Sequence, residues 1–399
     1  MAFCHIIIEV DIMKKITIKM MIFLSMCLIG LGLLNHPKLK AEGELVTSAK
    51  TAILIEVETG QVLYEYKAHE RAIPASMTKI MSIKLIFDAL DSKRITKDQV
   101  VTTSSYASSM GGSQIFLSTG EQMRVDDLLK SAIIASANDA TVALAETISG
   151  SEEFFVASMN QKAKELGLKN TNFVNATGLP VNNHYSTSYD MAMIARSLLL
   201  EYEEEVIPYS SLYEDYIRKD QEDPFWLVNT NKLVKHVEGV DGLKTGWTES
   251  AGYCLTCTKS VNGMRLISVV MGCDSVPNRT KDTLALLNYG FANYEKEVLI
   301  AKGSVISNEQ NIMLAPASYN IIASQNVVYL HKKGENKGTI NYQVKIDHNA
   351  ISKLAKYEIG KLQIYRNDVL FQEINLELEV PVVKQSFIKL FIEILKKIF

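Results

Sequence analysis

The chain has 399 residues, of which 47% are hydrophobic and 22% charged, and its formal net charge is −3 at pH 7. This length allows two domains with a sizeable core after any leader is removed. The near-neutral charge and the lack of a long basic block argue against nucleic acid as a partner.

The N-terminal segment has the pattern of an export signal. A basic stretch at 13–19 precedes an apolar run at 20–34, and the sequence Leu-Lys-Ala ends at Ala41 as a cleavage site. The apolar run is shorter than a membrane-spanning helix requires. We therefore expect a signal peptide over 1–41 and an exported protein.

The middle of the chain mixes strand and helix patterns. Residues 48–70 are expected to form two strands joined by a Thr-Gly turn, and an apolar helix follows Pro74. The stretch from 104 to 205 is mostly helical, and a closing helix covers about 279–294. Between them, strands return at "GVDGLKTGW", "GYCLTCTKS" and "MRLISVVMGC". Residues 45–300 are thus predicted to form an α/β domain whose sheet takes strands from both ends of the segment, with helices inserted between them.

The C-terminal part of the chain has a different pattern. Short alternating runs over 301–381 predict a small all-β domain, and 382–399 predict an amphipathic helix. In that helix Lys389, Glu393 and Lys396 share one stripe. The helix is too short and too charged to span a bilayer, so it either lies in the membrane surface or docks on the protein. We favour the membrane surface, at the outer face of the cytoplasmic membrane, because apolar residues cover most of its circumference.

The five cysteines do not predict a metal site or a disulfide. Cys4 and Cys27 would leave with the leader, and an odd number remains. Cys254 and Cys257 have C-x-x-C spacing, but on a strand two positions three apart face opposite sides. No second pair is available for zinc. We expect Cys254, Cys257 and Cys273 to be buried free thiols and predict no metal.

A serine and a lysine stand three residues apart at the start of the apolar helix after Pro74. Ser76 and Lys79 therefore share one helix face. Burial disfavours the charge of a lysine, so Lys79 is either paired or has a lowered pKa. A neutral amine next to a hydroxyl is an arrangement that activates a serine nucleophile.

Two further motifs follow Ser76 along the chain. The first lies between two predicted helices and the second opens a strand: Ser136-Ala137-Asn138 and Lys244-Thr245-Gly246. Ser-x-x-Lys and Ser-x-Asn also occur elsewhere in the chain, so each motif alone is weak evidence. The ordered set of three is a signature of active-site serine acyl transfer.

With these motifs and connecting segments such as "FVNATGLP" and "GVDGLKTGWTESAGYCL", residues 45–300 resemble the penicillin-binding proteins. The closest likeness is to the low-molecular-mass D-alanyl-D-alanine carboxypeptidases, serine peptidases of the S11 type. The resemblance implies a penicillin-binding-protein/serine β-lactamase-like α+β domain with an antiparallel sheet. It also implies removal of the terminal D-alanine from peptidoglycan stem pentapeptides through an acyl-enzyme on Ser76, binding of β-lactams at the same serine, and no cofactor.

The resemblance gives each motif residue a role. Ser76 is the nucleophile, and its backbone N–H belongs to the oxyanion hole. Lys79 is the general base, and the nearby charge of Lys244 helps to depress its pKa. Ser136 relays a proton to the leaving amine, and Asn138 holds the substrate amide.

The remaining site residues are expected to bind the substrate. The backbone N–H of Trp247 completes the oxyanion hole, and the small Gly246 lets the peptide lie along the strand edge. Lys244, Thr245 and Arg279 bind the terminal carboxylate, to which a guanidinium donates two hydrogen bonds. Trp247 stands where relatives often carry His or Tyr, so we expect its ring to affect substrate fit.

Two other functions remain open from the sequence. A class A-like β-lactamase shares the three motifs but needs an added glutamate to activate water. The segment "ELGLKN" from Glu165 nearly matches the required pattern, with Lys169 intruding. The second alternative is a non-catalytic cell-wall binding protein on the same fold, against which the intact catalytic motifs argue.

Overall fold

The computed structural model describes residues 45–348, 351 and 359–398. The predicted signal peptide, 1–41, lies outside the described residues, as do Cys4 and Cys27. The export signal therefore stays a prediction.

A five-stranded antiparallel sheet forms the centre of the first domain, with the strand order β2-β1-β9-β8-β7. Its strands are β1 (Thr51–Glu56), β2 (Val62–Tyr66), β7 (Val240–Thr248), β8 (Gly252–Val261) and β9 (Met264–Cys273). The strands β1 and β9 are rich in β-branched and other apolar residues and are buried almost without interruption, as expected of a sheet that is covered on both faces. The predicted union of strands from both ends of the domain is confirmed, and β7 lies at one edge.

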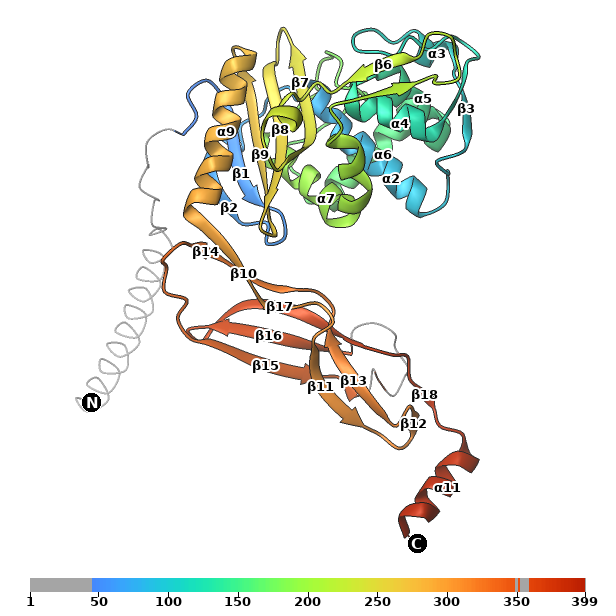
Figure 1. The fold of residues 1–399 in the computed structure, drawn as a ribbon, viewed down its shortest axis with the longest axis vertical. Helices are drawn as coiled ribbons and strands as arrows, with labels where there is room; N and C mark the ends of the chain where they lie inside the picture. Colours follow the sequence, from blue (N-terminus) through green and yellow to red (C-terminus); the bar gives the residue numbers. More distant parts are fainter. Residues whose placement is uncertain (1–44, 349–350, 352–358, 399) are drawn as a thin grey trace, which may run out of the picture. The chain divides into compact units, whose positions relative to one another are not determined.

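Helices cover both faces of this sheet (Figure 1). The helix α9 (Val276–Asn293) packs on one face, whereas α7 (Ser188–Ser210) and α2 (Lys79–Asp91) lie on the other. Ten of the thirteen residues of α2 are buried, which explains why its sequence is apolar on almost every side. The helix α9 begins one turn earlier than predicted, because the Ser275 side chain accepts a hydrogen bond from the Asn278 N–H and caps it.

The region between α2 and β7 is less helical than predicted. Its helices are α3 (Ser105–Ser108), α4 (Val125–Ile134), α5 (Asn138–Ser149), α6 (Glu152–Glu165), α7 and α8 (Leu233–His236). Two hairpins accompany them: β3 (Val100–Thr102) with β4 (Gln122–Arg124), and β5 (Glu214–Ile217) with β6 (Phe225–Val228). Residues 109–121 form neither helix nor strand, because Gly111, Gly112 and Gly120 interrupt the pattern.

The C-terminal region contains strands, as the sequence predicts. One sheet has the order β11-β13-β17-β16-β15, while β10 pairs with β14 and β12 with β18. These strands are β10 (Tyr294–Ile300), β11 (Val305–Gln310), β12 (Leu314–Ala315), β13 (Ser318–Ala323), β14 (Val327–Lys332), β15 (Ile340–Ile346), β16 (Gly360–Arg366), β17 (Val369–Leu378) and β18 (Val383–Lys384). Ile321, Ile364 and Leu376 belong to their common apolar core. The predicted fold class is confirmed.

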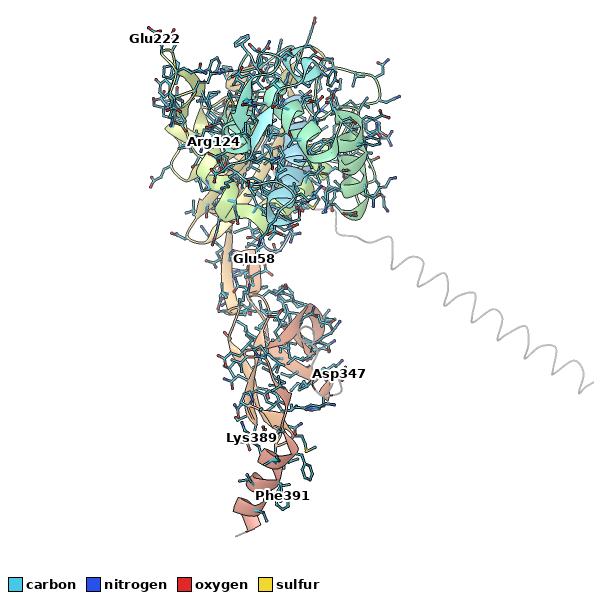
Figure 2. The ribbon with its side chains drawn as sticks, turned by 90° about the vertical axis from the view of Figure 1, so that its right-hand side faces the viewer. Glu58, Arg124, Glu222, Asp347, Lys389 and Phe391 are labelled. Atoms are coloured by element: carbon cyan, nitrogen blue, oxygen red, sulfur yellow. The ribbon has the colours of Figure 1, made fainter. Side chains whose placement is uncertain are left out.

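The chain ends in the helix α11 (Phe387–Ile398), on which Figure 2 labels Lys389 and Phe391. Large apolar side chains of this helix are exposed: Phe387, Ile388, Phe391, Ile392, Ile394 and Leu395. Within the described part of the chain, no helix has the length and apolar character needed to cross a membrane. The helix lies within the segment 382–399, for which the sequence predicts an amphipathic helix. Its attachment to a membrane stays a prediction.

The three described cysteines are free and buried, as predicted. Cys254 and Cys257 lie on β8 and Cys273 at the end of β9. Burial raises the pKa of all three thiols, to about 11 for Cys254 and about 12 for the other two. They are therefore protonated and unreactive at neutral pH.

Candidate active site

Ser76 lies in a tight helical turn that leads directly into α2. The turn spans Ala75–Thr78, and the next residue, Lys79, begins the helix. Ala75 has a positive φ of 48°, a strained conformation for alanine directly before Ser76. Ser76 is half-buried, whereas Lys79 is completely buried.

The Lys79 amine contacts three oxygen atoms. Its Nζ lies 3.2 Å from Ser76 Oγ, 2.5 Å from Asn138 Oδ1 and 2.8 Å from the carbonyl oxygen of Thr177. Burial is the main cause that holds the pKa of Lys79 well below its usual value, and the charge of Lys244 adds to it. The charge of Asp139 acts in the opposite direction but is the smallest of the three effects.

The Asn138 side chain is fixed by a loop. Its Nδ2 donates to the carbonyl oxygen of Gly111 at 2.7 Å, which turns Oδ1 toward Lys79. Its backbone N–H, at the start of α5, donates to Ser113 O at 2.7 Å. Ser136 lies two residues earlier, between α4 and α5, with φ of 63°, and its buried hydroxyl has no hydrogen-bond partner among the described residues. A free hydroxyl here is available to a bound molecule.

The strand β7 lies against the turn that carries Ser76. A Cβ atom on Gly246 would stand 2.7 Å from the carbonyl oxygen of Pro74, so only glycine allows this approach. The Thr245 hydroxyl donates to Thr230 Oγ1 at 2.8 Å. Trp247, the next residue, exposes 57% of its surface.

Lys244 and Arg279 are two buried cations that have no anionic partner among the residues the structure describes. Neither takes part in an ion pair within the described residues, and Lys244 Nζ donates to the neutral carbonyl oxygen of Thr245, at 3.1 Å. Burial and the charge of Arg279 lower the pKa of Lys244 to about 7. Burial also lowers the pKa of Arg279, and its Nε has no hydrogen-bond partner in the part of the chain that the structure describes. Such a pair of cations favours an incoming anion.

The structure therefore brings the predicted residues into one region. Ser76, Lys79 and Asn138 are in direct contact, Lys244 acts on Lys79 through its charge, and Arg279 acts on Lys244. Across residues 45–348, 351 and 359–398, no group of His, Cys, Asp or Glu side chains is arranged to hold a metal ion.

Sequence reasoning missed three contributors to this region. The Thr177 carbonyl receives a Lys79 hydrogen bond, and Gly178 packs so closely that an added Cβ would stand 1.8 Å from Ala75 O. Asp139, which directly follows Asn138, is fully buried and accepts hydrogen bonds from the Ile115 and Leu117 N–H groups. The segment "NATGL" signalled the first two, because its glycine marks a close backbone approach.

Comparison with known proteins gives a consistent picture. Residues 38–275 match the family model Peptidase_S11, described as D-alanyl-D-alanine carboxypeptidase. The D-alanyl-D-alanine carboxypeptidase DacF of Bacillus subtilis is 42% identical over 373 residues, which are 92% of this chain and 95% of that protein.

Two solved structures extend the likeness to the fold. Penicillin-binding protein 5 from Haemophilus influenzae has 32% sequence identity and a TM-score of 0.67, covering 84% of this chain and 98% of its own. Penicillin-binding protein D2 from Listeria monocytogenes, in its ampicillin-bound form, has 32% identity and a TM-score of 0.57, covering 62% of this chain and all of its own.

Proposed function

Because this chain belongs to the Peptidase S11 family of D-alanyl-D-alanine carboxypeptidases, we propose that it removes the terminal D-alanine from peptidoglycan stem pentapeptides through an acyl-enzyme on Ser76. The observation that carries the proposal is the set of three oxygen atoms around Lys79 Nζ. A base must accept the proton of the serine hydroxyl. The hydrogen bonds of Lys79 determine whether its amine can be that base.

The hydrogens of the Lys79 amine determine which contact can accept a proton. A neutral amine has two N–H bonds and one lone pair. The Thr177 carbonyl and Asn138 Oδ1 can only accept hydrogen bonds, so they take the two N–H bonds. The lone pair is left for the Ser76 hydroxyl, whose oxygen lies 3.2 Å away. Lys79 thus removes the proton as Ser76 attacks.

In the first step Ser76 Oγ bonds to the carbonyl carbon between the two D-alanines, and its proton passes to Lys79. The backbone N–H groups of Ser76 and Trp247 stabilise the oxyanion. Collapse of the intermediate breaks the peptide bond, and the proton that Lys79 took up passes by way of Ser136 to the leaving amine. Asn138 holds the substrate amide. Water then hydrolyses the ester and releases the shortened peptide.

The substrate is held at its end and along its backbone. Lys244 and Arg279 lack an anionic partner among the described residues, which supports their role in binding the terminal carboxylate together with Thr245. The position of β7 at the sheet edge supports pairing of the peptide with that strand beside Gly246. β-Lactams would acylate the same Ser76, and the ampicillin-bound relative supports this.

The two alternative functions are less well supported. Glu165 is exposed at the end of α6, where it accepts a hydrogen bond from Gln161 and pairs with Lys162. The water-activating glutamate of a β-lactamase would instead have to face the serine and its base. A purely binding role does not explain the buried, hydrogen-bonded Lys79 amine.

We further propose that the protein is exported and held at the outer face of the cytoplasmic membrane. The basic and apolar pattern of 1–41 supports export. The exposed apolar side chains of α11, interspersed with Lys389, support peripheral attachment to a lipid surface. Its substrate, peptidoglycan, lies in the same compartment.

The direct test incubates the protein with a pentapeptide that ends in D-alanyl-D-alanine and measures free D-alanine. The wild-type chain is expected to release it, whereas Ser76→Ala is not. Ser386→Ala is the matched control, because Ser386 and Lys389 repeat the Ser-x-x-Lys spacing at the start of the terminal helix, and it should retain full activity. Equal release by the wild type and Ser76→Ala would reject the proposal.

A further inference from the structure

Phe116 is an exposed aromatic residue with a strained backbone. It lies in the irregular loop 109–121 and exposes 67% of its surface, although its neighbours Ile115 and Leu117 are buried. Its φ is 57°, in the left-handed region that bulky residues avoid. Strain of this kind persists only where the surrounding structure imposes it, and it gathers at functional sites.

Two charged side chains impose this conformation. Asp139, fully buried, accepts hydrogen bonds from the backbone N–H groups on either side of Phe116: Ile115 at 3.1 Å and Leu117 at 3.0 Å. Arg218 donates to the Ile115 carbonyl at 2.9 Å and pairs with Glu121 at 2.8 Å. The loop is therefore held on both sides, and the Phe116 ring is directed outward.

The same loop contacts the proposed active site. Gly111 and Ser113 accept hydrogen bonds from the side chain and the backbone of Asn138. Asp139, the residue that holds Phe116 in place, directly follows Asn138 in α5. Phe116 thus lies on a loop that borders the site on the side of Asn138.

A second ring supports the Phe116 side chain. Phe225, at the start of β6, has its ring centroid 6.2 Å from that of Phe116, in an edge-to-face arrangement. The Arg218 guanidinium lies 5.7 Å from the Phe225 centroid. The Arg218 guanidinium thus packs against Phe225, and the rings of Phe116 and Phe225 together form an apolar surface.

We propose that Phe116, supported by Phe225, binds the aliphatic chain of the diamino acid that precedes the two D-alanines of the stem peptide. This inference rests on the proposed function. In that function Asn138 binds the amide of the substrate. The part of the peptide that precedes the scissile bond would then run past Asn138 toward the loop 109–121 and Phe116. A ring without polar groups suits methylene groups, and its fixed position makes the contact at little cost in entropy.

The test compares two substrates with two variants. One pentapeptide carries the diamino acid at its third position, and the other carries glycine there. Phe116→Ala should lower kcat/KM about tenfold on the first and leave the second unchanged, because one apolar contact of this size discriminates by about that factor. Phe116→Gly should behave alike and, since glycine adopts positive φ freely, should not unfold the loop.

A matched control makes the result specific. Phe154 is equally exposed, at 66%, but lies on α6, away from the loop 109–121, so Phe154→Ala should leave both rates unchanged. Equal rates of the wild type and Phe116→Ala on the diamino substrate would overturn the inference, and so would an equal loss on both substrates. Absence of D-alanine release by the wild type would instead reject the proposed function.

Discussion

Replacing Lys244 with methionine should stabilise the protein while abolishing its activity. The folded chain buries this amine next to Arg279 without an anionic partner among the described residues, which lowers its pKa from 10.5 to about 7. Each pH unit between these values corresponds to about 1.4 kcal/mol, so a protonated Lys244 destabilises the folded chain by about 5 kcal/mol. A neutral methionine of similar length removes that cost.

The sign of the pH dependence follows from the two pKa values. The unfolded chain keeps Lys244 protonated up to about pH 10.5 and the folded chain only up to about pH 7, so the penalty is complete below pH 7 and fades as the pH rises to 10.5. At pH 9 about 2 kcal/mol remains. Relative to Lys244→Met, the wild type should therefore gain about 3 kcal/mol of unfolding free energy between pH 6 and pH 9.

Urea unfolding of both proteins at these two pH values measures the difference. Lys84→Met is the contrasting control, because Lys84 is equally buried but forms ion pairs with Asp88 and Glu201, and its loss should destabilise the fold. Unfolding free energies of the wild type and Lys244→Met that change in parallel with pH would refute the reasoning from unpaired burial.

Two other predictions concern a glycine and the terminal helix. Gly178→Ala should lower the unfolding free energy by at least about 2 kcal/mol and slow acylation by penicillin, since the new Cβ would stand 1.8 Å from Ala75 O next to Ser76. Gly167→Ala has a similar positive φ but nothing within 4 Å, so an equal effect there would contradict this reason. Removal of 386–399 should abolish binding to anionic phospholipid vesicles in a sedimentation assay and leave the hydrolysis of soluble pentapeptide unchanged. Equal vesicle binding by both forms would exclude α11 as the attachment.

The sequence was sufficient for those parts of the structure that depend on side-chain patterns. The strand-like segments after residue 238 predicted β7, β8 and β9, and the apolar run after Pro74 predicted α2. The buried free thiols followed from their odd number, from their positions on strands and from the lack of a second cysteine pair. The contact of Ser76 with Lys79 followed from their spacing on a helix, since residues three apart share one face.

Other features left no such signal. The Thr177 carbonyl that binds Lys79 is a backbone atom, so no side-chain pattern marks it. The conformation of Phe116 depends on Asp139 and Arg218, which are distant in sequence and meet it only in the folded chain. The N-terminus of α9 differed by one turn because its start is set by the Ser275 cap rather than by apolar spacing.

The order of strands in the central sheet also determines at which point of synthesis the active site can form. The strand β1 pairs along its whole length with β9, so residues near 50 find their partners only near 270. A nascent chain that ends before that point lacks the middle of its sheet and cannot fix β7 against the Ser76 turn. The first domain therefore cannot complete its central sheet until most of it has been synthesised, and the active site forms in one late, cooperative folding step.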